Sequence, residues 1–170
     1  SEASIWVKTY GGAGQDSARS LIETSDGGYA IAGSTESLGA GGNDFWLVKT
    51  DAAGNEEWNQ TYGGTGDDYG RCVIQTSDGG YALAGYTRSY GAGSDDFWLV
   101  KTDASGTATW EHTYGGASAD NLWSLIQTSD GGYALAGHTA SYGAGNGDFW
   151  LVKTDSIGTV DWDETYGGAD

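Results

Sequence analysis

The sequence predicts an all-β fold built from one unit that is repeated three times. The same motifs return every 52 residues, and the triplet Tyr-Gly-Gly begins at Tyr10, Tyr62, Tyr114 and Tyr166. No stretch shows the 3.6-residue periodicity of an amphipathic helix. The 31 glycines alone would suit a disordered chain, but the 8 Trp, 11 Tyr and 3 Phe residues indicate a folded protein with many tight turns.

No insertion interrupts the repeat, so the whole chain, residues 1–170, is predicted to form a single repeat domain. We expect the three units at about 13–64, 65–116 and 117–168. Residues 1–12 match the end of a unit, and they are expected to add one extra strand of the outermost type.

The second unit illustrates the four strands that we expect in each copy, named a to d in chain order. Strands a and b are predicted at residues 71–76 and 81–87, and the Asp-Gly step between them favours a primed hairpin turn. Strands c and d are predicted at 97–102 and 109–114, with a second tight turn between them. With the d-type strand around Trp6, the chain is expected to hold thirteen strands.

Strands b and c are apolar on both faces, as the consecutive residues Phe97, Trp98, Leu99 and Val100 illustrate. Such runs predict a strand that is buried on both sides of its sheet. A blade of a β-propeller is in this position, because each sheet is sandwiched between two neighbours. We therefore predict a β-propeller with three four-stranded antiparallel blades plus one extra strand. The β-trefoil and the β-prism are threefold alternatives, although a trefoil barrel would favour alternation along each strand.

Three blades are too few to close a propeller. Packed sheets lie about 10 Å apart and four strands span about 14 Å, so three radial sheets would collide at the axis. Six blades leave a narrow channel and fall within the usual range. We expect two copies of the chain to pair into a six-bladed ring, and three copies making nine blades is the less favoured arrangement. The surplus d strand, at Trp6 or Trp162, is then exchanged with the partner or left unpaired.

The motifs SDGGYALAGYT, DFWLVKTD and TYGG resemble those of a secreted repeat family found on cell-surface proteins of archaea and bacteria. The segment from Lys101 through Asp103 and Gly106 to Trp110 is also similar to the tryptophan-docking motif of quinoprotein-type propellers. That motif implies that Trp58 and Trp110 are buried between adjacent blades, but it implies no quinone-binding residues. The family resemblance implies an extracellular or cell-surface location. Members usually carry more copies, which implies a fragment or an engineered subset of a longer array.

The charge of the chain disfavours two classes of partner. Its 24 acidic and 7 basic residues give a formal net charge of −17. Such a surface repels the polyanionic backbones of DNA and RNA, and it disfavours anionic membranes for the same reason. No apolar run approaches the roughly 18 residues of a membrane-spanning helix. We therefore expect no nucleic-acid partner and no membrane insertion.

No catalytic constellation is visible in the sequence. Nucleophilic catalysis needs a nucleophile, a base and an orienting group, but His112 and His138 stand at positions that are not histidine in the other units, and Cys72 aligns with serines as a small buried residue. We expect no enzyme and no cofactor. The alternative of a propeller hydrolase or a quinone-type oxidoreductase fragment requires a histidine or carboxylate cluster in the channel. A further alternative is an engineered sequence for blade assembly with no evolved ligand.

Aspartates recur in every unit. Those of the two tight turns, such as Asp78 and Asp103, are explained by bonds to nearby backbone amides. Lysines late in strand c, such as Lys101, are their expected partners. The aspartates that end the b–c and d–a loops are candidate metal ligands, and they are Asp44, Asp96, Asp148, Asp16, Asp68 and Asp120. Calcium prefers six to eight oxygen ligands, so we favour a role for these side chains as caps of the loop amides.

The positions that differ between units lie around the d–a and b–c loops, which a propeller brings to one face. Several are aromatic or arginine residues, which are typical of binding hot spots, and aromatic rings can stack on sugars. The candidate ligand-binding residues are Tyr69, Arg71, Tyr86, Arg88, Tyr90, Trp123, His138 and Tyr142. The sequence thus predicts a non-enzymatic scaffold or ligand-binding module, with a glycan or another small molecule as the ligand class.

Overall fold

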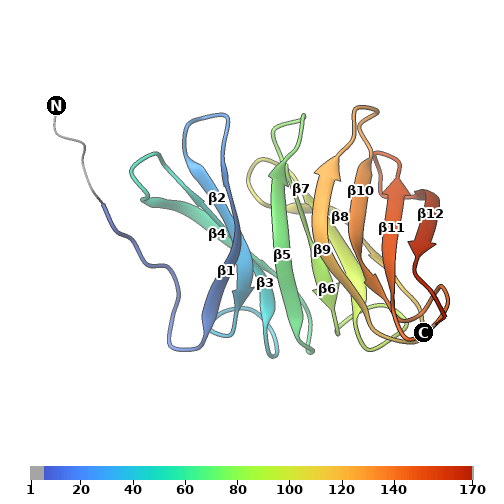
Figure 1. The fold of residues 1–170 in the computed structure, drawn as a ribbon. Coiled ribbons are helices and arrows are strands. Elements are labelled where there is room, and N and C mark those ends of the chain that lie inside the picture. The colour runs from blue at the N-terminus through green and yellow to red at the C-terminus, as the bar shows by residue number, and fades with distance from the viewer. Residues whose placement is uncertain (1–5, 170) are drawn as a thin grey trace.

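The computed structural model describes residues 6–169, which form twelve β-strands in three four-stranded antiparallel sheets (Figure 1). The first blade holds β1 (Asp16–Glu23), β2 (Tyr29–Thr35), β3 (Asp44–Thr50) and β4 (Glu56–Tyr62). The second blade holds β5 (Asp68–Gln75), β6 (Tyr81–Thr87), β7 (Asp96–Thr102) and β8 (Ala108–Tyr114). The third blade holds β9 (Asp120–Gln127), β10 (Tyr133–Thr139), β11 (Asp148–Thr154) and β12 (Val160–Tyr166). No helix able to span a membrane occurs within residues 6–169.

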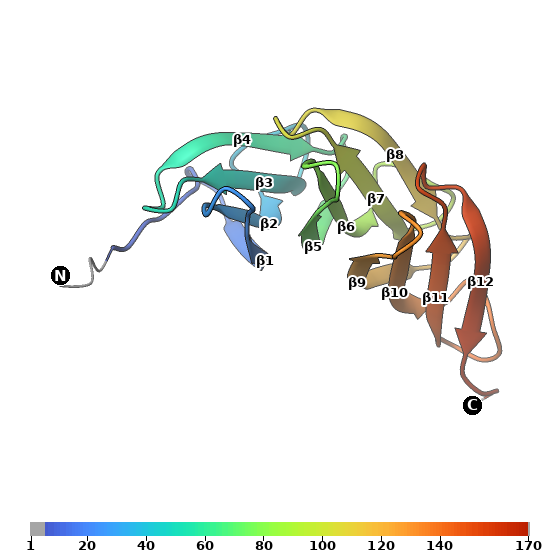
Figure 2. The same ribbon diagram turned by 90° about the horizontal axis from the view of Figure 1, so that it is seen from above.

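The three sheets stand side by side as propeller blades, which confirms the predicted architecture over the trefoil and the prism. In each sheet the strands follow chain order, and each strand pairs with the next. Figure 2 shows an arc in which β1, β5 and β9 lie on the inner side and β4, β8 and β12 on the outer side. The first and third blades do not meet, so the ring is open.

The extra d-type strand predicted around Trp6 is not formed in the described part of the chain, where residues 6–12 have no strand. Residues 1–5 of that prediction lie outside the described residues. In each blade strand d pairs with strand c of the same sheet, and residues 6–12 have no such partner strand in the described part of the chain. Residues 6–169 therefore contain twelve strands and not the predicted thirteen.

The a–b turns differ from the primed turns that the Asp-Gly step suggested. In the first blade the Thr24 carbonyl accepts a hydrogen bond from the Gly27 amide, and within this turn only Gly27 has a positive φ, of 84°. Asp26 keeps a negative φ, and its side chain accepts a hydrogen bond from the Gly28 amide at 3.0 Å. This pattern is typical of a hairpin that ends in a glycine bulge, and the capping role predicted for the turn aspartate is confirmed.

The core lies between the blades. One cluster joins the face of the first blade, with Phe45 and Leu47, to that of the second, with Leu83 and Trp98. A second, equivalent cluster joins the second blade to the third. We call the side of a blade that faces the next blade along the chain its forward surface, and the opposite side its receiving surface. The second blade is covered on both, and β6 and β7 are buried along their whole length.

Candidate functional site

Each internal interface is anchored by a phenylalanine of the forward surface. Phe45 packs on Trp98 of the next blade, with 4.5 Å between ring centroids. Its ring lies against Gly85, where a Cβ would be only 2.9 Å from the Phe45 Cζ atom. One repeat later Phe97 packs on Trp150 at 4.7 Å. The glycine on the receiving surface thus provides the space that the phenylalanine fills.

Strand d adds a second pair of contacts to each internal interface. Trp58 packs edge-on against Tyr81 of the next blade, with ring centroids 5.7 Å apart. The Tyr62 hydroxyl donates to the Gly106 carbonyl at 2.5 Å. Trp110 and Tyr114 repeat these contacts on the third blade.

The predicted position of the docking tryptophans, between adjacent blades, is therefore correct, but their predicted burial is not. Trp58 and Trp110 lie between blades, yet both are only partly buried. Strand d is the outermost strand of its blade, so one edge of each indole reaches solvent. The strand c tryptophans Trp46, Trp98 and Trp150 are buried, as expected.

The forward surface of the third blade exposes the residues that are buried in the other two. Phe149 is 51% exposed, whereas Phe45 and Phe97 are fully buried. Trp162 and Tyr166, which stand where Trp58 and Tyr62 do in the first blade, are also exposed. The third blade therefore ends in an unused copy of the internal forward surface.

The inner part of the receiving surface of the first blade is the unused counterpart. Leu21 is 63% exposed, although the equivalent Val73 is buried in the second blade. A cavity of about 60 Å³ is lined by Ile31, Gly33, Trp46 and other residues. Gly33 and Trp46 correspond to the glycine and tryptophan between which Phe45 and Phe97 insert. The cavity is thus an interblade phenylalanine site without its phenylalanine.

Buried carboxylates also meet at the internal interfaces. A Cβ at Gly63 would collide with carboxylate oxygens of both Asp44 and Asp68, so the two side chains lie next to each other. Asp68 caps the d–a loop through the Gly64 amide at 2.9 Å and accepts a hydrogen bond from Ser89 at 2.6 Å. Burial, with the charge of Asp68 as a smaller cause, raises the pKa of Asp44 to about 6. This interface therefore contains a carboxyl group that holds its proton to a higher pH than an ordinary aspartate does.

The other loop aspartates follow the same plan. Asp96 and Asp120 meet at Gly115 as Asp44 and Asp68 do at Gly63. Asp16 and Asp148 stand at the two ends of the array, where none of residues 6–169 brings a second carboxylate to either. Of the described side chains, no three or more of His, Cys, Asp and Glu come together in a way that could hold a metal ion.

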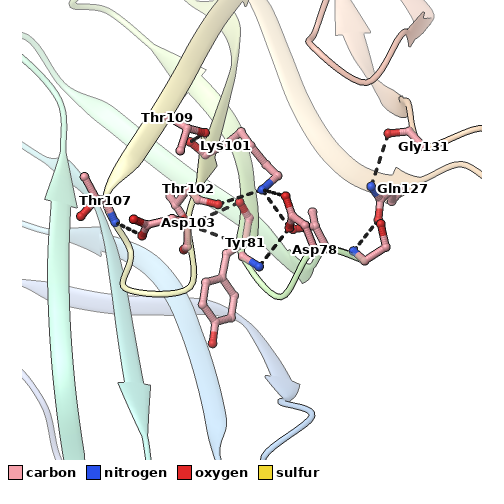
Figure 3. Close-up of polar contacts among 12 residues, drawn as sticks. Asp78, Tyr81, Lys101, Thr102, Asp103, Thr107, Thr109, Gln127 and Gly131 are labelled. Carbon is pink, nitrogen blue, oxygen red and sulfur yellow. Dashed lines mark hydrogen bonds and ion pairs between the residues drawn. The ribbon is translucent and has the colours of Figure 1, made fainter.

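Lys101 illustrates how strand c is tied to the a–b turn (Figure 3). Its buried ammonium group lies 2.8 Å from Asp78 Oδ2 and donates to the Thr102 carbonyl at 2.8 Å. Hydrogen bonds from Lys101 and then Thr76 lower the pKa of Asp78 to about 2. Lys49 and Lys153 make equivalent pairs, so the predicted lysine–aspartate pairs are confirmed, with lysines more buried than expected.

A depression of about 370 Å³ lies beside this pair, between the second and third blades. Gln127 crosses it, accepting a hydrogen bond from the Ser77 amide at 3.0 Å and donating to the Gly131 carbonyl at 3.3 Å (Figure 3). Gln75 makes the equivalent bond to Ser25 one repeat earlier. At this depression Gln127 therefore joins the second blade to the third.

Four of the candidate ligand-binding residues form one cluster on the second blade. Arg71 donates to the Tyr86 hydroxyl at 3.1 Å, and the Tyr69 and Tyr86 rings are 5.1 Å apart. Arg88 lies over the Tyr69 ring and pairs with Asp95 at 2.5 Å. The cluster is partly closed in on itself, since Tyr86 is buried.

The other four candidates are found in different surroundings. Trp123 and His138 are neighbours on the third blade, with ring centroids 6.2 Å apart, and Trp123 is well exposed. Tyr90 stacks on Trp98 and donates to the Gly63 carbonyl, and Tyr142 makes the same contacts one repeat later. These two tyrosines join strands and loops of adjacent blades.

A β-bulge in each inner strand is a feature that sequence reasoning missed, although two of the three residues at the bulges, Arg71 and Trp123, were candidate ligand-binding residues. Strands β1, β5 and β9 each have one residue more than the strands they pair with, and the register shifts once in each. The residues left out of the pairing are Arg19, Arg71 and Trp123. Bulges are frequent next to functional sites because they redirect a side chain. The variable residues at these positions were visible in the sequence, but the pairing that isolates them was not.

His112 and Cys72 make structural contacts in the described part of the chain. His112 bonds to the Ile157 carbonyl at 3.0 Å. Cys72 packs against the core, and burial raises the pKa of its thiol to about 12. Within residues 6–169, no hydrogen bond or ion pair joins either histidine to a hydroxyl, a thiol or a carboxylate. Comparison of the sequence with protein-family models and with curated proteins finds no match.

Proposed function

We propose that the chain is a non-enzymatic repeat module that binds copies of itself, third blade to first blade, and so forms a closed ring. One observation carries this proposal. The two ends of the array are the two halves of an interface that the chain already uses twice internally. Phe149 supplies the phenylalanine, and the cavity beside Gly33 and Trp46 offers the site.

The arrangement is head to tail, because the two surfaces that meet are different. Such interfaces give closed rings when the rotation per copy completes a circle. Two copies would bring six blades and three copies nine, and six falls within the usual four to eight. Burial of Phe149, Trp162 and Tyr166 would remove large aromatic surfaces from water, the main favourable contribution to association.

The mass of the assembly in solution tests the proposal. Light scattering after size exclusion should give twice the 17.6 kDa mass of one chain, or three times for the nine-bladed form. The variant Phe149→Ser should shift the mass toward one chain. Val160→Ser is the matched control, because Val160 is an exposed apolar residue of β12 that lines a groove with Trp150 on the opposite face. A single-chain mass for the unaltered protein across a hundredfold concentration range would refute ring formation.

A second candidate function is the binding of an anionic ligand at the inner strands. Strand c lysines and Arg88 each have a carboxylate within 4 Å, whereas Arg19 and Arg71 have none among the described residues. In a chain of net charge −17 these two guanidinium groups without a carboxylate partner stand out, and both are at bulges on the channel side. Together with the exposed Trp123 they suit a ligand that carries a carboxylate or sulfate and a ring, such as an acidic glycan.

An array of acidic and neutral glycans tests this second function. We expect acidic glycans to be bound and the variant Arg71→Gln to lose that binding. Lys8→Gln is the control, since it removes one positive charge outside the inner strands. Equal loss in the two variants would mean that net charge alone governs binding. The cell-surface location implied by the sequence motifs accords with a glycan ligand and stays a proposal.

A further inference from the structure

Residues 6–10, the N-terminal segment, lie on the receiving surface of the first blade as strand d of a preceding blade would. Trp6 packs on Tyr29, with 6.2 Å between ring centroids. A Cβ at Gly54 would lie 2.5 Å from the Trp6 ring, and the Tyr10 hydroxyl donates to the Gly54 carbonyl at 2.7 Å. Strand β4 makes the same contacts with the second blade, one repeat further along the chain.

The segment also covers part of the surface that a preceding blade would bury. Residues 6–169 contain no blade in front of the first one, yet β3 is buried along its whole length. Tyr10 lines the cavity beside Trp46 and Val48, so it covers residues that strand d of a neighbour would cover. The segment therefore occupies the outer part of the receiving surface and leaves the phenylalanine site empty.

Ring closure would place β12 of another copy on the part of the receiving surface that the N-terminal segment occupies. If the third blade of one copy meets the first blade of the next, Trp162 and Tyr166 take the positions of Trp58 and Tyr62 in the internal interface. Their contacts would then be Tyr29 and Gly54 of the second copy, which Trp6 and Tyr10 already hold. The two sets of side chains exclude each other.

We propose that the N-terminal segment is an intramolecular competitor of self-association, displaced from the first blade when β12 of another copy docks there. The proposal rests on the ring assembly proposed above, and it identifies the groove, its occupant and the strand that replaces it. The segment lowers the fraction of chains that are ready to associate, and the apparent affinity falls by that fraction.

The contacts of the N-terminal segment and of β12 indicate which of the two gives up its place on the first blade. β12 is hydrogen-bonded to β11 along its length, and the Trp150 indole donates to Asp163 at 2.9 Å. The residue that corresponds to Asp163 in the N-terminal segment is Val7, which cannot accept this bond. No backbone hydrogen bond joins residues 6–10 to a strand in the described structure. The segment is held by side chains alone, so it is the one that yields.

Two conservative substitutions test whether the N-terminal segment and β12 compete for one hydrogen-bond acceptor, the Gly54 carbonyl. Tyr10→Phe removes the hydrogen bond of the segment, and the dissociation constant for self-association should fall about fivefold. Tyr166→Phe removes the bond that β12 would make to a second copy, and the constant should rise by about the same factor. Trp6→Ala should lower it by more than about tenfold. Sedimentation equilibrium of the full chain measures all three, and Val7→Ala, at an exposed position of the same segment, is the control.

Each outcome separates the competition from the ring itself. An unaltered protein that associates, with Tyr10→Phe and Trp6→Ala unchanged, would overturn the competition and leave the ring standing. Weaker association of Trp6→Ala with no effect of Tyr166→Phe would show that the segment, and not β12, completes the interface, which also overturns it. Failure of every variant to associate, Trp6→Ala included, would overturn both. Near-ultraviolet circular dichroism confirms that each variant is folded.

Discussion

Strands β7 and β11 have the same seven-residue sequence but different surroundings. All of β7 is buried, whereas β11 alternates between buried and more exposed residues. Phe97 in β7 is fully buried, and Phe149, its counterpart in β11, is 51% exposed. The difference arises because the second blade has a neighbour on each side and the third blade has only one. The burial of a strand in this protein is thus set by what packs against its two faces, and not by its own sequence.

The largest test of this comparison is the same substitution in both strands. Phe97→Ala should lower the free energy of unfolding by about 3–5 kcal/mol, the usual cost of a buried Phe→Ala change. Phe149→Ala should cost less than about 1 kcal/mol in a dilute, single-chain sample, because half of its surface is already in water. Urea unfolding measures both. Equal costs would mean that the forward surface of the third blade is covered even in one chain.

A smaller effect should appear in the pH dependence of the interface between the first and second blades. The pKa of Asp44 is raised to about 6 in the folded chain, from an ordinary value near 3.8. The protonated form is therefore favoured by folding, so this group contributes stability below pH 4 that is lost as the pH rises through 6. Asp44→Asn should remove that loss and stabilise the protein at pH 7 by roughly 1–3 kcal/mol.

Urea unfolding at pH 4, 5, 6 and 7 checks the Asp44 prediction. Glu56→Gln, at an exposed carboxylate on β4, controls for the loss of one negative charge. If Asp44→Asn and Glu56→Gln change the slope equally, the effect belongs to the overall charge and the buried pair has no special role.

The tyrosines of strand d give a third, weaker comparison. Tyr114 donates to the Gly158 carbonyl at 2.7 Å across an internal interface, whereas the equivalent Tyr166 is exposed. Tyr114→Phe should lower the free energy of unfolding by about 1 kcal/mol. Tyr166→Phe should leave the single chain unchanged. A measurable cost for Tyr166→Phe at low concentration would contradict this assignment.

The smallest expected effect concerns metal removal. Several loop aspartates serve the backbone, as Asp68 does at the Gly64 amide and Asp96 at Ala92 and Gly93. We expect EDTA to leave the melting temperature unchanged within about 1 °C, because no bond that holds these loops needs a cation. A large drop that calcium reverses would instead identify Asp44 and Asp148 as ligands.

The sequence was sufficient for features that repeat and are local. The 52-residue step, the continuous apolar runs and the turn aspartates predicted the blades, their strands and the caps at Asp26 and Asp103. Features that depend on a neighbouring sheet were not accessible in the same way. The approach of Asp44 to Asp68 joins two blades, and the isolation of Arg71 at a bulge depends on the pairing of β5 with β6. Pattern alone also could not separate β7 from β11, because their sequences are identical.

The open arc with complementary ends has a kinetic consequence if two copies close a ring. Such a ring contains two identical junctions, and breaking one leaves the copies tethered by the other. The separated ends then remain at a high effective concentration and rejoin before the copies can diffuse apart. Dissociation would therefore require both junctions to open together, so a ring made of modest contacts would exchange subunits slowly. Copies joined end to end without closing would lack this protection and lose terminal subunits one at a time.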